Sequence, residues 1–161
     1  MKVQLLSMNV DNEFGVLTRI TSLIRREGWN IKSLAVAETL DPAVSCITVC
    51  IECLDSALSH VRTRLGKLDC VKSLTVFDPQ KHERIELAVV SVLSSDKNAA
   101  EACAQSFGAR LLCMDGGRQV FEITKDPVQI DAFINNLASF GTVNVTRSGA
   151  IMIEKSVNAD K

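Results

Sequence analysis

A short polar segment near the start of the chain carries the residue types that best suit ligand chemistry. Asp11-Asn12-Glu13-Phe14-Gly15-Val16-Leu17 separates a strand-like run from a helix-like run. A helix N-terminus offers unpaired backbone N–H groups and partial positive charge, which suit a carboxylate, and a glycine lets a ligand approach the backbone. The amide of Asn12 can accept from an ammonium group and donate to a carboxylate. These features suit a free amino acid, although the same residues also suit a plain turn and helix cap.

The other reactive residues are poorly arranged for catalysis or metal binding. Cys50-Ile51-Glu52-Cys53 has the CxxC spacing of zinc and redox sites, but in an extended strand the two thiols point to opposite faces. His60 and His82 show no ligand spacing, and the chain contains neither a nucleophile motif nor a phosphate-binding loop. We therefore expect reduced core thiols and no catalytic residue, metal or cofactor on this chain. A small enzyme using a thiol or a metal is the disfavoured alternative.

The elements that must position the polar segment follow from hydrophobic periodicity. The first half of the chain predicts strands over residues 3–10, 30–39, 44–53 and 70–77, with helices after Gly15 and across residues 54–68. In the strand at 44–53, the residues Ile47, Val49, Ile51 and Cys53 share one face, which must meet the helices. The predicted order is βαββαβ.

The second half repeats this pattern after a short linker at residues 78–82, where Pro79 and polar residues leave no room for an element. Asp96 can cap one helix, and Asp126-Pro127 opens another. The expected strands lie at residues 84–93, 110–114, 119–124, 142–145 and 150–153, with a hairpin turn at Asp115-Gly116-Gly117-Arg118. We therefore predict an α+β fold of two ferredoxin-like βαββαβ units, divided into residues 1–78 and 79–161.

Composition narrows the classes of partner. The chain has 161 residues and a net charge of −1, with nine positive and nine negative side chains before Pro79 and nine and ten after it. Neither half has the excess positive charge with which proteins bind the phosphate backbone of nucleic acids, and the aromatic residues that stack on bases are scarce. No apolar run approaches the roughly 20 residues that span a bilayer, and Met1 leads into a mixed strand instead of a signal region. We expect a cytoplasmic protein, and units this small favour oligomerisation.

Two sets of residues resemble a known family. Asn12-Glu13-Phe14-Gly15-Val16-Leu17-Thr18-Arg19 resembles the opening motif of ACT domains, and the segment from Gly28-Trp29-Asn30-Ile31 to Asp41-Pro42 resembles the small regulatory subunits of acetolactate synthase. In the second half, Glu83-Arg84-Ile85-Glu86-Leu87 and Arg147-Ser148-Gly149 resemble the C-terminal domain of those subunits.

The resemblance implies a non-catalytic protein that activates a separate catalytic large subunit and confers feedback inhibition by valine in branched-chain amino acid biosynthesis. Thiamine diphosphate, Mg²⁺ and FAD would reside on that catalytic partner. Two ACT domains would pair in a homodimer with the effector at their interface. Asn12, Gly15, Val16 and Leu17 would hold it from one protomer, and Asn30 and Ile31 would reach in from the other. The alternative is a free-standing ACT-type amino-acid sensor that regulates a different enzyme.

Overall fold

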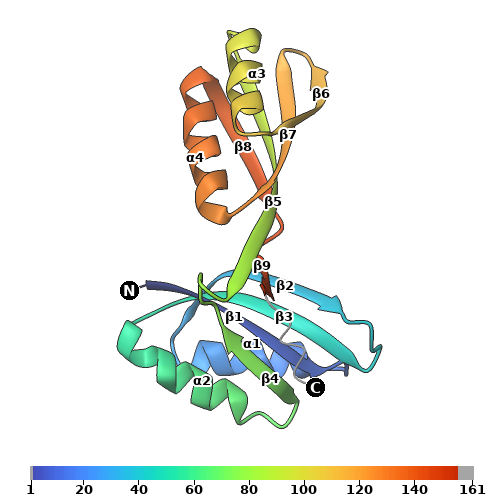
Figure 1. The fold of residues 1–161 in the computed structure, drawn as a ribbon, viewed down its shortest axis with the longest axis vertical. Coiled ribbons are helices and arrows are strands. Elements are labelled where there is room, and N and C mark those ends of the chain that lie inside the picture. The colour runs from blue at the N-terminus through green and yellow to red at the C-terminus, as the bar shows by residue number, and fades with distance from the viewer. Residues whose placement is uncertain (1, 156–161) are drawn as a thin grey trace. The chain divides into compact units, whose positions relative to one another are not determined.

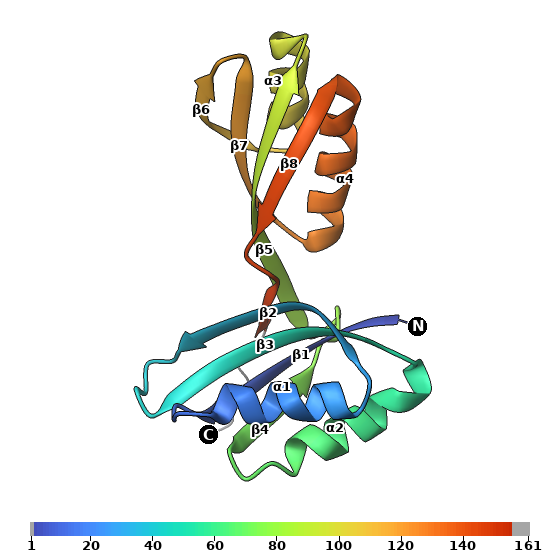
Figure 2. The same cartoon turned by 180° about the vertical axis from the view of Figure 1, so that it is seen from behind.

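The computed structural model describes residues 2–155, and its first sheet contains four antiparallel strands in the order β2-β3-β1-β4 (Figure 1). These strands are β1 (Lys2–Asp11), β2 (Asn30–Glu38), β3 (Val44–Cys53) and β4 (Val71–Val76). The helices α1 (Val16–Arg26) and α2 (Leu58–Gly66) cover one face of this sheet (Figure 2), and a 3₁₀ turn at Asp55–Ala57 precedes α2. The predicted βαββαβ order is confirmed for this unit.

The core of the first unit lies between the sheet and its two helices. Alternate residues of β3 face the helices, as predicted, and Ile47, Val49 and Ile51 are each at most 1% exposed. From α1, Ile20 and Ile24 pack into the same cluster. Burying one such side chain contributes roughly 1.5–3 kcal/mol. This packing fixes both ends of α1 relative to β1 and β2.

The second unit repeats the same topology, with strand order β6-β7-β5-β8 and β9 paired to β5. The strands of this second sheet are β5 (His82–Ser94), β6 (Arg110–Asp115), β7 (Arg118–Lys125) and β8 (Gly141–Arg147). The short strand β9 (Ile151–Glu154) pairs with β5, but its residues belong to the first compact unit. The helices are α3 (Lys97–Ser106) and α4 (Pro127–Leu137), with a 3₁₀ turn at Ala138–Phe140 after α4. Both helices lie on one face of their sheet (Figure 1).

Capping and turn residues act in the second unit as the sequence predicts. The carboxylate of Asp96 accepts from the Ala99 amide at 3.0 Å, and that of Asp126 accepts from the Val128 amide at 2.9 Å. Gly116 and Gly117 close the β6–β7 hairpin with φ angles of 53° and 89°. Two successive positive φ angles suit the right-handed twist of a tight hairpin.

The compact units divide elsewhere than the expected boundary between residues 78 and 79. The first unit contains residues 2–83 and 150–155 of the described chain, and the second contains residues 84–149. The C-terminal segment joins the first unit because the Lys155 amide donates to the Lys81 carbonyl at 2.8 Å and its ammonium group pairs with Glu83 at 3.2 Å. The expected linker is also shorter than predicted, because His82 already belongs to β5.

Candidate functional site

The start of α1 is an open helix N-terminus. Gly15 is the N-cap residue, with φ 83° and ψ −6°, and no side chain caps the helix. A Cβ atom built on Gly15 would have no neighbour within 4 Å, so the space beside this backbone is open. The Val16 amide donates to the Glu13 carbonyl at 3.3 Å, so the amides of Leu17 and Thr18 are left to bind an anion at this partly positive helix end.

Asn12 lies beside this helix start, but the fold already uses most of its hydrogen-bonding capacity. Its amide nitrogen donates to Glu38 Oε1 at 3.0 Å and to the Pro42 carbonyl at 2.9 Å. Its amide oxygen accepts from Ser45 Oγ at 2.9 Å. One acceptor position on that oxygen is left for an ammonium group, whereas a carboxylate must be bound by other donors.

Val16 and Leu17 occupy different environments. Val16 is 5% exposed and packs in the core of the first unit, so its side chain supports the helix start from inside. Leu17 is 39% exposed and lies on the outer surface of α1. Of these two predicted apolar contacts, only the side chain of Leu17 is accessible in a single chain.

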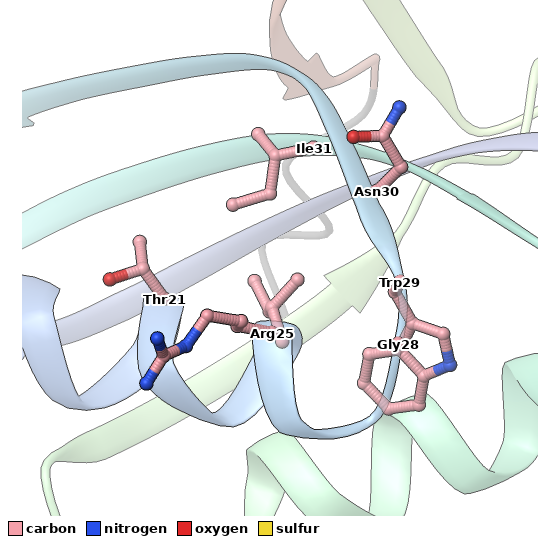
Figure 3. A pocket seen from close by; sticks show the side chains of 7 residues that line it. Thr21, Arg25, Gly28, Trp29, Asn30 and Ile31 are labelled. Carbon is pink, nitrogen blue, oxygen red and sulfur yellow. The ribbon is translucent and has the colours of Figure 1, made fainter.

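Asn30 and Ile31 line a surface hollow at the other end of α1 (Figure 3). The hollow lies where the helix turns into β2, and Gly28 adopts a positive φ of 74° at this turn. Ile31 projects toward Thr21 and Arg25. The residues that line the hollow are Thr21, Ile24, Arg25, Gly28, Trp29, Asn30 and Ile31.

A single chain does not bring the two groups of predicted residues together. Gly15 caps the start of α1, and Asn30 follows its end. The helix has 11 residues and is therefore about 16 Å long. An amino acid that contacts the residues at both ends of α1 at the same time must therefore lie between two copies of the chain.

An ionic cluster holds the end of α1 against α2. Glu27 accepts from Arg64 Nε at 2.8 Å, and its other oxygen lies 3.0 Å from His60 Nε2. The hydrogen bond with His60, followed by that from Arg64, holds the pKa of Glu27 below its ordinary value. The Trp29 ring meets the His60 imidazole edge-on, with 6.1 Å between ring centroids. This cluster fixes the turn that carries Trp29 and Asn30.

Sequence reasoning did not identify Thr21 and Arg25 as residues of this hollow. A positive charge in the last turn of a helix is favourable by itself, so the sequence offered no reason to assign Arg25 a role in binding. The available signal was the spacing of four residues between Thr21 and Arg25, which places both on one side of a helix.

The charged residues of the second unit form a structural cluster. Glu86 is 5% exposed, and it accepts from Arg147 Nε at 3.0 Å and from the Gly149 amide at 3.1 Å. Arg147 also pairs with Asp131. The hydrogen bond to Glu86 contributes most to raising the pKa of Arg147. The segments 83–87 and 147–149, which carry the family resemblance in the second half, therefore contact each other through Glu86.

The described residues do not form a metal-binding or thiol-based site. Cys50 lies opposite Leu5 and Cys53 opposite Lys2 on the β1–β3 ladder, so both belong to one regular strand, three positions apart, where side chains point to opposite faces as predicted. All six cysteines carry thiols. Within residues 2–155, no group of three or more His, Cys, Asp or Glu side chains is placed to hold a metal ion. In the same part of the chain, no helix has the length and apolar character needed to cross a membrane.

Comparison with known proteins accounts for both units. A family model described as the AHAS small subunit-like ACT domain matches residues 6–73, and one described as the small subunit of acetolactate synthase matches residues 85–156. This chain belongs to the acetolactate synthase small-subunit family. The predicted recognition is thereby confirmed, and the first unit is an ACT domain. Members of the family are non-catalytic regulatory subunits.

Acetolactate synthase small subunits from other organisms match this chain over nearly its whole length. The acetolactate synthase small subunit of Aquifex aeolicus is 28% identical over 96% of this chain and 82% of its own length. The acetolactate synthase small subunit of Haemophilus influenzae is 28% identical over 94% of this chain and 95% of its own length. The crystal structure of the acetolactate synthase small subunit from Thermotoga maritima matches with a TM-score of 0.84 and 25% identity, over 97% of this chain and 99% of that one. The predicted α+β fold is confirmed.

Proposed function

We propose that this chain activates the catalytic large subunit of acetolactate synthase and makes that enzyme sensitive to feedback inhibition by valine. Thiamine diphosphate, Mg²⁺ and FAD belong to the catalytic partner in this proposal. The observation that carries it is the pair of complementary half-sites at the two ends of α1, one at the uncapped start beside Gly15 and one at the hollow that Asn30 and Ile31 line. A cytoplasmic location is part of the same proposal.

The helix start supplies the recognition of the ligand carboxylate. The amides of Leu17 and Thr18 are the first-turn donors for the carboxylate, because the Val16 amide already donates to the Glu13 carbonyl at 3.3 Å. The open space beside Gly15 lets a carboxylate approach them. The free acceptor position of the Asn12 amide oxygen takes one hydrogen of the ammonium group. The apolar side chain of valine then lies against Leu17 of the same copy and Ile31 of the other.

The free edge of β2 provides the means of joining the half-sites. Among the described residues, β2 pairs only with β3, so its other edge is an unpaired template for a second copy. A two-fold axis makes the two β2 strands antiparallel. Asn30 starts the strand and Glu38 ends it, and Glu38 is bonded to Asn12. Such pairing therefore brings Asn30 and Ile31 of one copy beside Asn12 of the other, and each dimer contains two sites.

Feedback requires the effector to favour one arrangement of the paired ACT domains. An effector that binds two arrangements equally leaves their populations unchanged. Valine bound across the interface instead stabilises the arrangement in which both half-sites meet. That preference reaches the catalytic subunit through the same dimer. Activation does not need valine, so the two effects can be separated by mutation.

A matched pair of substitutions at Gly15 tests the proposal. Asp and Asn have nearly the same shape and the same strain at a positive φ angle, but only Asp places a negative charge where the ligand carboxylate docks. In the reconstituted enzyme, we expect Gly15→Asp to activate normally and to raise the valine concentration for half-inhibition by about 10- to 100-fold. The Gly15→Asn variant should retain more of the sensitivity. Inhibition of the Gly15→Asp enzyme at the wild-type valine concentration would show that this site is wrong.

A further inference from the structure

We propose that Arg25 is a carboxylate-binding residue of the effector site, contributed by the copy that also supplies Asn30 and Ile31. This inference rests on the function proposed above and adds a residue to it. The valine carboxylate then has backbone N–H groups from the helix start of one copy and a guanidinium group from the hollow of the other. Arginine recognises carboxylates well because its planar fork donates two parallel hydrogen bonds.

The guanidinium group of Arg25 is available for a ligand. Its side chain makes no hydrogen bond or ion pair within the described chain, residues 2–155. Glu27 is the acidic residue nearest to it in sequence, but both oxygens of Glu27 are engaged by His60 and Arg64 of α2. The fold thus withdraws the obvious counter-ion and leaves an exposed cation at the rim of the hollow.

The rest of the hollow suits an apolar side chain. Ile31 is partly buried and provides apolar surface beside Arg25, whereas Ile24 is 1% exposed and closes the hollow from the core side. The Thr21 hydroxyl donates back to the Leu17 carbonyl at 2.9 Å, so that donor is already used within the helix. Figure 3 shows Thr21, Arg25 and Ile31 on one side of the turn. A cation beside an apolar surface fits the two ends of an aliphatic amino acid.

The negative end of the helix dipole does not prevent a carboxylate from binding here. The carbonyl groups of Leu23, Ile24 and Arg25 already accept from the amides of Glu27, Trp29 and Gly28 at 3.1–3.2 Å. A ligand carboxylate therefore does not face bare carbonyl oxygens. Because the dipole alone also favours Arg25, the neighbouring Arg26 is the appropriate control: it occupies the same last turn but does not line the hollow.

Calorimetric titration with L-valine and with L-valinamide, which lacks the carboxylate, tests this role. The full chain is used in complex with the catalytic subunit, as wild type and as Arg25→Gln, Arg25→Lys and Arg26→Gln. We expect Arg25→Gln to weaken valine binding by about 10- to 100-fold and to reduce the preference for valine over valinamide by the same factor. Arg25→Lys should restore part of the affinity, and Arg26→Gln should behave as wild type. Thermal unfolding should place all variants within a few degrees of one another.

The outcomes separate this inference from the function on which it rests. Wild-type affinity and an unchanged valine preference in Arg25→Gln would overturn the role of Arg25 while the valine site stands. Equal weakening by Arg25→Gln and Arg26→Gln would also overturn it, because it would reflect helix charge in general. Absence of valine binding by the wild-type complex would overturn the proposed function and the inference together.

Discussion

At the scale of single residues, Asn12 links the proposed effector site to the β2–β3 hairpin. Its backbone amide donates to the Ala43 carbonyl at 2.9 Å, and its side chain binds Glu38, Pro42 and Ser45. Asn12 therefore orders the loop before α1 and the hairpin tip at the same time. A ligand that contacts this amide acts on a residue that the fold already holds in place, which lowers the entropy cost of binding.

Replacing Asn12 should affect stability as well as binding. Asn12→Ala removes three side-chain hydrogen bonds at an exposed position, so we expect the free energy of unfolding to fall by about 1–2 kcal/mol. Urea denaturation measures this change. Asn9→Ala is a suitable control, because Asn9 is exposed on β1 and does not contribute to this network. A fall no larger than that of Asn9→Ala would mean that the hairpin tip does not depend on Asn12.

At the scale of elements, the contact between α1 and α2 positions the hollow. Glu27 at the end of α1 meets His60 and Arg64 of α2, and Trp29 packs against the same histidine. The hollow thus depends on a helix that contributes no residue to it. This arrangement also explains why Arg25 has no partner within the helix pair.

The lowered pKa of Glu27 predicts how this contact responds to acid. A carboxyl group whose pKa is lower in the folded chain adds stability above its ordinary pKa of 4.5, and that stability is lost as the pH falls through its lowered value. We therefore expect Glu27→Gln to lower the melting temperature near pH 7 and to lower it progressively less toward pH 3. A difference from wild type that stays constant over this range would contradict the assignment. Glu13→Gln, at an exposed carboxylate before α1, controls for general charge effects.

At the scale of the whole molecule, local patterns predicted most of the elements. The alternation in Val44–Cys53 gave the limits of β3, because a period of two over ten residues is a strong signal. The second helix was predicted too long: Leu54 is 59% exposed and a 3₁₀ turn occupies Asp55–Ala57. Apolar spacing does not reveal where a helix tightens into such a turn. The return of residues 150–155 to the first unit depends on contacts with Lys81 and Glu83 that no local pattern contains.

The candidate site was only partly predictable for the same reason. Gly15 and the helix start follow from the local sequence. The engagement of Asn12 requires the hairpin tip some thirty residues later, and the availability of Arg25 requires Glu27 to turn toward α2. These properties depend on tertiary contacts, so they became visible only with the fold.

The most direct test of the central claim, that each effector site is formed by two copies of the chain, is complementation between two defective variants. Gly15→Asp damages one half-site and Asn30→Ala the other, so neither homodimer should bind valine. When the two chains are unfolded and refolded together, random pairing makes about half of the dimers mixed, and each mixed dimer regains one intact site. Calorimetric titration should then recover about a quarter of the wild-type number of sites at wild-type affinity. No recovered binding in a mixture that contains mixed dimers would contradict a site shared between two copies.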